Sequence, residues 1–278
     1  MFFRRFDYLE MGIIYFILAI LTVIFIVPYL WLLSSSLKDP TEIFKVPIAW
    51  IPAVLKWDNF YKATHVIPFF LYLGNTLTII AWSEIGSLVS NTLVAYGFAK
   101  IKWKGRNFLF IILLMTMMMP FQVVMIPLYL FFNKLRWIGT FLPLIVPTFF
   151  GNPFFIFLLR QFFIGIPNEL LDSARIDGAS EFVIFSRIVL PLCKPALAMV
   201  AIFTFLFTWN DFIGPLVFLT NSKKYTLAIG IQQIMSVNDP RWNILMAAGV
   251  LMTLPVLIIF FLLQKYFIQG ITFTGIKG

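Results

Sequence analysis

Two acidic residues stand inside long apolar stretches of this sequence, where a charged side chain is costly and therefore indicates a role. Glu84 is the single charged residue of the segment 66–99, and Asp211 is the single charged residue of the segment 195–222. At the centre of a bilayer a charge costs at least about 2.5–3.5 kcal/mol, so such a residue should face a cavity or the interior of a helix bundle. The chemistry open to these carboxylates is hydrogen bonding, either to a polar solute or to neighbouring helices.

Small polar residues accompany both acids at helical spacing. Ser87 and Asn91 follow Glu84, while Thr204 and Thr208 precede Asp211. One interpretation places these side chains along a solute pathway. The alternative is that they hold helices together, as small polar residues often do in membranes, and for Asp211 a structural or gating role is favoured. The candidate pathway residues are Asn75, Glu84, Ser87, Asn91, Gln122, Thr208, Asn210 and Asp211.

The residues that most enzyme chemistry needs are missing. With one cysteine, Cys193, and one histidine, His65, the chain can build neither a disulfide framework nor a Cys/His metal site. It also has no GxxxxGK(S/T) phosphate loop with which to bind ATP. We therefore predict that the chain is not itself an enzyme and holds no metal or cofactor.

The elements that position the polar residues are helices long enough to cross a membrane. Of the 278 residues 61% are hydrophobic and 12% charged, whereas soluble domains are about half apolar and one quarter charged. Since about 20 apolar residues cross roughly 30 Å of hydrocarbon, the uncharged blocks predict an all-α integral membrane protein. Its six transmembrane helices are expected at about 12–33, 71–98, 108–131, 138–159, 196–219 and 244–264. Prolines predict kinks in the third helix, at Pro120 and Pro127, and in the fourth, at Pro143, Pro147 and Pro153.

Basic residues orient the helices. The short segment Lys100–Arg106 places four basic residues beside two helix ends, where the positive-inside rule acts most strongly. Both termini are therefore predicted to be cytoplasmic, and the first apolar block is read as a retained anchor because it exceeds the core of a signal peptide. The net charge of +9 is explained by loops near anionic lipid, with no basic helix that would indicate nucleic-acid binding. The single transmembrane domain 1–278 then has a cytoplasmic N-terminus 1–11, an external loop 34–70, a cytoplasmic loop 161–192, an external loop 220–243 and a cytoplasmic tail 265–278.

The predicted cytoplasmic loop 161–192 carries the signals of two short helices. Asn168 is expected to cap the first helix and Gly178 to end it in a left-handed conformation. Ser180 is expected to cap a second helix, which Pro191 should end. The apolar residues Leu170, Leu171 and Ala174 fall on one side of the first helix, and so far from hydrocarbon they should need a protein partner.

This loop resembles the EAA signature of the permeases of ATP-binding-cassette (ABC) importers. The family pattern reads Glu-Ala-Ala, three residues, Gly, then Ile-x-Leu-Pro, and here it is Asp172-Ser173-Ala174, Gly178 and Ile188-x-Leu190-Pro191. Asp for Glu and Ser for Ala are conservative departures. Flanking matches at 119–129, 157–163, 209–211 and 264–278 extend the resemblance to nearly the whole chain, and the stretch 169–180 looks like the carbohydrate branch, the relatives of the maltose-system permease MalG.

The resemblance implies a MetI/MalG-like permease fold in the cytoplasmic (inner) membrane of a prokaryote. It implies uptake of a sugar or oligosaccharide that an external binding protein delivers, with the loops 34–70 and 220–243 touching that protein. The partners would be a second, non-identical permease and an ABC ATPase dimer, which would bind ATP and Mg. The residues implied to dock the ATPase are Glu169, Asp172, Ser173, Ala174, Arg175, Asp177, Gly178, Ile188, Leu190 and Pro191.

Two other functions stay open on the residues alone. A proton- or ion-coupled secondary transporter would use Glu84 as the coupling acid, although the internal symmetry typical of such proteins is not evident in this sequence. A membrane scaffold without any pathway is the other alternative. Uptake that needs ATP would separate the importer from both.

Overall fold

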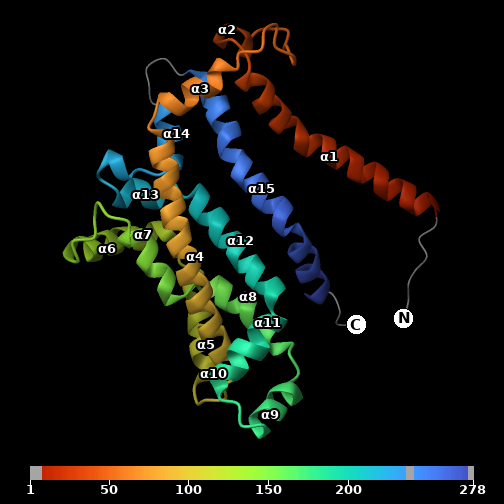
Figure 1. Ribbon diagram of the computed structural model, residues 1–278, viewed down its shortest axis with the longest axis vertical. Coiled ribbons are helices and arrows are strands. Elements are labelled where there is room, and N and C mark those ends of the chain that lie inside the picture. The colour runs from red at the N-terminus through yellow and green to blue at the C-terminus, as the bar shows by residue number, and fades with distance from the viewer. Residues whose placement is uncertain (1–7, 236–240, 275–278) are drawn as a thin grey trace. The chain divides into compact units, whose positions relative to one another are not determined.

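The computed structural model describes residues 8–235 and 241–274, and in that part of the chain every regular element is a helix (Figure 1). The all-α prediction is therefore confirmed, while predictions that fall on residues 1–7, 236–240 and 275–278 lie outside the described residues. The chain divides into two units, residues 1–69 with 231–254 and residues 70–230 with 255–278. In chain order the elements are α1 (Tyr8–Ser36), α2 (Pro40–Ile43), α3 (Asp58–His65), α4 (Phe69–Ala99), α5 (Arg106–Thr116), α6 (Phe121–Lys134), α7 (Leu142–Ile145), η1 (Val146–Phe150), α8 (Pro153–Ile164), α9 (Asn168–Ile176), α10 (Glu181–Ile184), η2 (Phe185–Val189), α11 (Leu190–Leu192), α12 (Lys194–Asn210), α13 (Ile213–Phe218), η3 (Ser222–Lys224), α14 (Leu227–Met235) and α15 (Trp242–Thr274).

Candidate membrane spans account for most of these helices. Within the described residues, four helical stretches are long and apolar enough to cross a bilayer, namely Leu9–Ser36, Phe69–Ala99, Leu142–Ile164 and Trp242–Lys265. Two further pairs of helices qualify only together, because each helix alone is too short; α5 and α6 meet at 97°, and the stretch Glu181–Leu192 meets α12 at 80°. By length and composition the described residues therefore contain four candidate spans, or six, the number predicted, if each bent pair counts as one.

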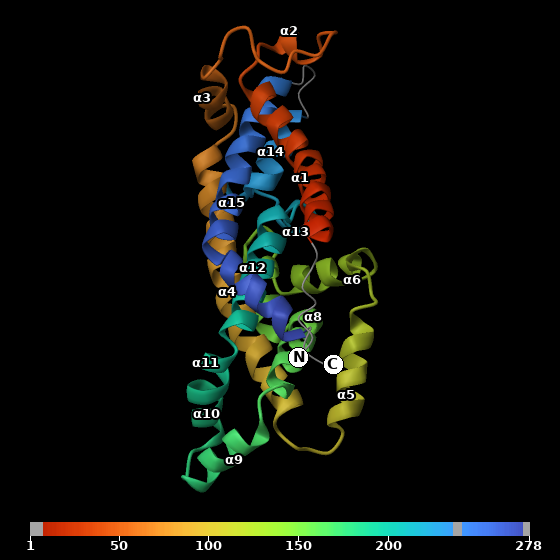
Figure 2. The ribbon, with the colours of Figure 1, turned by 90° about the vertical axis from the view of Figure 1, so that its right-hand side faces the viewer.

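The third predicted helix is broken rather than merely kinked. The sequence indicated one helix over 108–131, but α5 ends at Thr116 and α6 begins at Phe121, nearly at a right angle (Figure 2). Pro120 stands at the cap position of α6 in an extended conformation. Because proline has no backbone N–H and disfavours a helical residue before it, a helix does not continue from α5 through Pro120. Pro127, by contrast, lies inside α6 and does not end it.

The fourth and fifth predicted helices are also interrupted. Instead of one helix over 138–159, the chain forms α7, the 3₁₀ helix η1 and α8, with the left-handed Gly151 between η1 and α8. Instead of one helix over 196–219, α12 ends at Asn210, and α13 starts at Ile213. Of the four predicted spans between residues 69 and 230, only the one at 71–98 forms a single unbroken helix, α4.

A buried core joins α4 to the helices that follow α8. Tyr96 of α4, Leu159 and Phe163 of α8, Leu171 of α9 and Ile184 of α10 belong to one buried cluster. Leu159, Phe163 and Ile184 are fully buried. Because burying a large apolar side chain contributes about 1.5–3 kcal/mol, the short helices of the segment 161–192 are firmly packed against the bundle.

The predicted external loops contain helices of their own. The segment 34–70 holds α2 and α3, and the segment 220–243 holds η3 and α14. Buried Asn59 of α3 links three parts of the first unit. Its amide nitrogen donates to the backbone oxygens of Ser36 and Lys38, both at 2.9 Å, and its amide oxygen accepts from Asn243 at 2.8 Å.

Candidate functional site

The helix α9 ends in a Schellman motif built around Gly178. The backbone N–H of Ala179 donates to the carbonyl of Ala174 at 2.9 Å, and that of Gly178 donates to Arg175 at 3.0 Å. Gly178 has φ +82°, the left-handed conformation that costs a residue with a side chain about 1–2 kcal/mol. The predicted glycine stop is therefore confirmed, and its cause is the backbone, since a Cβ at this position would meet nothing within 4 Å.

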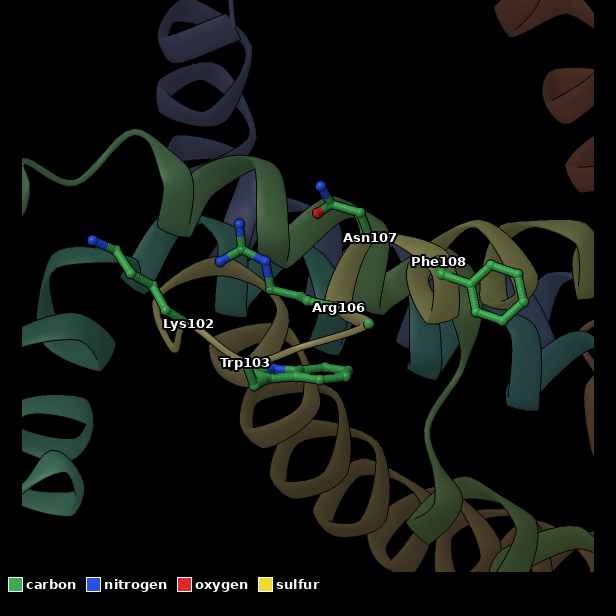
Figure 3. Close-up of a pocket in the computed structure, with 6 residues that line it drawn as sticks. Lys102, Trp103, Arg106, Asn107 and Phe108 are labelled. Carbon is green, nitrogen blue, oxygen red and sulfur yellow. The ribbon is translucent and has the colours of Figure 1, made fainter.

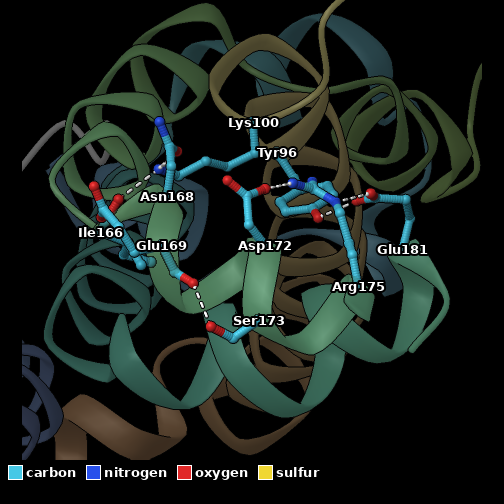
Figure 4. Close-up of polar contacts among 9 residues, drawn as sticks. All are labelled: Tyr96, Lys100, Ile166, Asn168, Glu169, Asp172, Ser173, Arg175 and Glu181. Carbon is cyan, nitrogen blue, oxygen red and sulfur yellow. Dashed lines mark hydrogen bonds and ion pairs between the residues drawn. The ribbon is translucent and has the colours of Figure 1, made fainter. Parts of the chain in front are cut away.

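The start of α9 is held by Lys100, which the sequence indicated only as part of the basic segment 100–106. Asn168 does not cap the helix as predicted, because Pro167 occupies the cap position and Asn168 is the first helical residue. The Asn168 side chain instead accepts a hydrogen bond at 2.9 Å from Nζ of Lys100, which also donates to the backbone oxygen of Ile166 at 2.6 Å (Figure 4). Burial lowers the pKa of Lys100. The lysine thus ties the residue after α4 to the first turn of α9.

The end of α9 is held by a network of three charged side chains and a tyrosine. Nε of Arg175 donates to Oε1 of Glu181 at 2.7 Å, and its Nη1 donates to Oδ1 of Asp172 at 2.6 Å. The hydroxyl of Tyr96 donates to the other oxygen of Glu181 at 2.6 Å (Figure 4). Hydrogen bonds to Glu181 and Asp172 raise the pKa of Arg175. Glu181 therefore bridges α9 and α4.

The second helix of the loop begins as predicted but does not end where expected. Ser180 caps α10 by accepting from the backbone N–H of Val183 at 3.4 Å. The chain then continues through the π-helical turn η2 into α11, so Pro191 lies inside a helix that ends one residue later. Ile188 and Leu190 are half-buried and pack against the core cluster.

The apolar stripe of α9 needs a correction. The sequence assigned Leu170, Leu171 and Ala174 to a partner, but Leu171 is 1% exposed and Ala174 packs on the core of this chain. At 3.6 residues per turn, the positions opposite Leu171 fall within about a third of the helix circumference. We call them the outer face of α9, and all five are exposed: Glu169, Leu170, Ser173, Ile176 and Asp177. Ile176 on this face is 86% exposed.

The ten predicted docking residues therefore divide into groups. Three of them, Glu169, Ser173 and Asp177, lie on the outer face, while Asp172 and Arg175 pair with each other beside it. Ala174, Ile188 and Leu190 pack inside the chain, Gly178 shapes the turn and Pro191 is exposed. Ile176, Tyr96 and Lys100 were not predicted from the sequence as site residues. No local signal marks the last two, because their contacts join residues 66 to 85 positions apart.

A cavity of about 950 Å³ gathers some of the predicted pathway residues. Thr208, Asn210 and Asp211 line it, and Asp211 also accepts a hydrogen bond at 3.0 Å from the backbone N–H of Gly214 in the first turn of α13. The polar residues in its lining that the sequence did not indicate are Thr76, Thr148, Asn152 and Thr226. Phe121, Phe207 and Phe218 add aromatic surface, and Asp211 is the one charged side chain in the lining.

The other predicted pathway residues do not line this cavity. Buried Asn91 donates to the backbone oxygen of Ser87 at 2.6 Å, and its own oxygen accepts from the backbone N–H of Asn152 at 2.6 Å. The hydroxyl of Ser87 lies 3.0 Å from that of Thr204 in α12. These contacts join helices, which favours the structural interpretation of Ser87 and Asn91.

Three further candidates occupy different surroundings. Asn75 donates to the backbone oxygens of Lys223 and Tyr225, both at 2.9 Å. Glu84 is half-buried, and its Oε2 has no hydrogen-bond partner within the described part of the chain. Gln122 is exposed on α6. Of the eight candidates, only Thr208, Asn210 and Asp211 line the cavity of about 950 Å³ together.

A smaller cavity of about 260 Å³ lies where α5 begins (Figure 3). Lys102, Trp103, Arg106, Asn107 and Phe108 are among its lining residues. Arg106 donates to the backbone oxygen of Ile101 at 3.2 Å. The two cations of this cavity belong to the basic segment on which the predicted orientation depends.

Comparisons with known proteins agree on one family. The profile of the binding-protein-dependent transport system inner membrane component matches residues 91–273. The arabinooligosaccharides transport system permease protein AraQ of Halalkalibacterium halodurans is 37% identical over 263 residues, which cover 94% of each chain. The sn-glycerol-3-phosphate transport system permease protein UgpE of Yersinia enterocolitica is 31% identical over 92% of each chain.

A solved structure shares the fold. It is a chain of a bacterial ABC transporter involved in the import of the acidic polysaccharide alginate, with a TM-score of 0.81 over 96% of this chain and 99% of that one. The sequence identity is 23%, so this likeness concerns the fold.

Proposed function

Because this chain belongs to the family of inner membrane components of binding-protein-dependent transport systems, we propose that it imports a sugar or oligosaccharide. As a member of that family it is a multi-pass permease subunit of an ABC importer in the inner membrane. In this proposal ATP and Mg are bound by a separate ATPase dimer. A second permease of different sequence completes the membrane part of the complex.

The observation that carries the coupling role is the outer face of α9. Leu170 and Ile176 are 44% and 86% exposed on a short helix whose opposite side is buried. Exposed apolar side chains ringed by polar ones mark contact surfaces for proteins. Both ends of α9 are anchored to the bundle, by Lys100 and by the Arg175–Glu181 pair. An ATPase that grips the outer face would therefore move the bundle with it, which is how a rigid element drives a switch between two states.

The polar cavity supports a neutral, hydroxyl-rich cargo. Its lining offers hydroxyl, amide and carboxylate groups beside three phenylalanines, and a few polar groups on a largely apolar wall are typical of small-molecule sites. Asp211 is the one charge in that lining, and a carboxylate disfavours an anion nearby. The arabinooligosaccharides in the name of the 37% identical relative fit such a lining better than a phosphate or uronate anion does. The proposed solute contacts are Thr208, Asn210 and Asp211.

The remaining parts of the proposal concern orientation and the binding protein. With both termini in the cytoplasm, the segment 161–192 faces the ATPase, and the segments 34–70 and 220–243 face an external sugar-binding protein. The basic residues at 100–106 support this orientation.

The test is reconstitution of the chain with its neighbouring permease and ATPase in proteoliposomes. We expect Ile176→Lys to reduce ATPase retention on the purified complex at least tenfold, because a charge would be buried in the interface. Ile51→Lys is the matched control, since Ile51 is 83% exposed in the segment predicted to face the other side. If Ile176→Lys retains the ATPase as the wild type does, the docking proposal is wrong. Uptake that follows a proton gradient without ATP, and is lost in Glu84→Gln, would favour the secondary transporter.

A further inference from the structure

The helix α4 differs from its neighbours in the second unit by being continuous. It runs for 31 residues, Phe69–Ala99, whereas the chain bends by 97° between α5 and α6 and by 80° before α12 (Figures 1 and 2). No proline lies within it. A bent or broken helix can absorb a displacement at its break, but a continuous one passes the displacement on.

One end of α4 holds the segment between α13 and α14. The side-chain amide of Asn75 donates to the backbone oxygens of Lys223 and Tyr225, both at 2.9 Å. The hydroxyl of Thr76 accepts from the backbone N–H of Leu227 at 2.9 Å. Three backbone groups of one segment are therefore fixed by two adjacent residues of α4.

The other end of α4 holds both ends of α9. Tyr96 donates to Glu181, which is paired with Arg175 at the C-terminal end of α9, and Lys100 donates to Asn168 at its N-terminal end (Figure 4). At 1.5 Å per residue, Thr76 and Tyr96 are about 30 Å apart along the helix. The two sets of contacts thus lie nearly a bilayer thickness apart on one rod.

We propose that α4 carries the displacement of α9 directly to the segment 219–227, with Tyr96, Lys100, Asn75 and Thr76 as the positioning residues. The inference rests on the proposed docking of an ATPase on α9. It adds a route by which ATP binding on one side of the membrane moves the segment that leads into α14 on the other. By thermodynamic reciprocity, whatever binds and moves the segment 219–227 also biases the position of α9.

The chain offers a clean way to follow that displacement. Cys193 is the one cysteine, so a Cys193→Ser background accepts a single spin label at Ser222→Cys, an exposed position in η3. The label is read in the reconstituted complex of both permeases and the ATPases, first without nucleotide and then with ATP and vanadate. We expect the spectrum of the otherwise unchanged complex to change with nucleotide. A complex that retains no ATPase, or hydrolyses no ATP, would contradict the proposed function itself and not only the role of α4.

The decisive variants lie at the α9 end, far from the label. Tyr96→Phe together with Lys100→Met is expected to leave the nucleotide-free spectrum of the label unchanged and the basal rate of ATP hydrolysis within about twofold of the parent. The same double variant is expected to remove more than half of the spectral change that nucleotide causes. If the double variant retains the ATPase but still shows the full change, α4 is not the route. If it loses the ATPase, Tyr96→Phe alone decides by the same criterion, because it removes only a hydroxyl group.

Two controls separate transmission from general damage. Thr78→Val lies on α4 three residues from Asn75, but its hydroxyl donates to Gly74 within the helix, so it should leave the change intact. Lys104→Met removes an exposed lysine near Lys100 and should also leave the nucleotide-dependent spectral change intact.

Asn75→Leu tests the other end of α4. In this variant the spectrum of the label should no longer change with ATP, while the ATPase stays bound. Asn75→Leu with a full nucleotide response would overturn the proposal as well.

Discussion

Arg175 and Glu181 are joined across the turn at Gly178 by a hydrogen-bonded ion pair, with Nε of the arginine 2.7 Å from Oε1 of the glutamate. The pair connects the last turn of α9 to the first turn of α10. Its side chains are 37% and 47% exposed, and exposed pairs contribute only about 0–1 kcal/mol to stability. We therefore expect the pair to matter for geometry more than for stability, because it fixes the angle at which α9 leaves the bundle.

The first prediction concerns this angle. Arg175→Met should loosen the turn at residues 176–183, so that their backbone amides exchange up to about fivefold faster, as the loss of about 1 kcal/mol allows. The thermal midpoint of the whole protein should stay within about 2 °C, because the core beneath α9 is unchanged. Hydrogen exchange measured by mass spectrometry checks both statements.

Arg187→Met is the matched control for this prediction. Arg187 is an exposed arginine of the same segment, and its loss should leave the exchange at 176–183 as it is. Arg175→Lys should give an intermediate rate, because a lysine lacks the planar fork that reaches two carboxylates. Equal exchange in Arg175→Met and the wild type would contradict the role assigned to the pair.

The second prediction compares two glycines that have empty space around them. A Cβ at Gly178 or at Gly97 would meet nothing within 4 Å, but only Gly178 has a positive φ, of +82°. Gly178→Ala should therefore destabilise the turn by about 1–2 kcal/mol. Gly97→Ala lies within α4 and should be neutral or stabilising by up to about 1 kcal/mol. Thermal unfolding in detergent measures the difference.

Gly178→Asn extends this comparison. Asparagine tolerates the left-handed conformation better than alanine does, so it should recover part of the lost stability. If alanine at 178 is as stable as alanine at 97, the turn does not depend on its backbone conformation. A requirement for glycine would then have to come from the docking partner.

The third prediction tests the buried amide of Asn91. Asn91→Leu removes the acceptor for the backbone N–H of Asn152 and the donor to Ser87, which leaves buried polar groups without partners. Each such group costs about 1–3 kcal/mol, so the thermal midpoint should fall clearly. Thr78→Val, on an exposed turn of the same helix, should change it little. An Asn91→Leu protein as stable as the wild type would restore a solute-contacting role for this residue.

The sequence predicted the membrane spans well, because the hydrophobicity that marks a span is summed over consecutive residues. Long uncharged blocks need no knowledge of neighbours, so α1, α4 and the apolar part of α15, Trp242–Lys265, lie within a few residues of the expected ranges, although α15 itself continues to Thr274. The breaks within the predicted helices were harder to predict, because a helix either continues through a proline or ends before it. Pro127 continues a helix whereas Pro120 precedes a right-angled bend, and which outcome occurs depends on whether neighbouring segments satisfy the freed backbone groups.

The candidate site was predictable where its cause is local and not where it is tertiary. Gly178 and Ser180 were correctly assigned, because a left-handed stop and a helix cap depend on adjacent residues. The apolar stripe of α9 was assigned to a partner because periodicity cannot tell which protein covers a buried side. Tyr96 and Lys100 could not be found, since their partners follow more than 65 residues later in the chain.

The last prediction separates two roles of Asp211 that the structure places in one side chain. Asp211 accepts a hydrogen bond from the backbone N–H of Gly214 in the first turn of α13, and it also lines the polar cavity. Asp211→Asn keeps an oxygen that can accept from Gly214 but removes the charge, so the thermal midpoint should hardly move. Asp211→Ala removes this acceptor as well and should cost about 0.5–2 kcal/mol, as the loss of a side-chain acceptor at a helix N-terminus does.

Transport should respond differently from stability. A hydrogen bond from a sugar hydroxyl to a charged group contributes about 1.5–3 kcal/mol, and one to a neutral group about 1 kcal/mol. Asp211→Asn should therefore raise the KM for uptake of an arabinooligosaccharide about tenfold without loss of stability, whereas Asp211→Ala should impair both. Uptake in proteoliposomes and thermal unfolding of the same preparations give the two readouts. If Asp211→Asn transports as the wild type does, Asp211 serves only as the acceptor for the backbone N–H of Gly214, and the solute contact must be made by Thr208, Asn210 or the second permease.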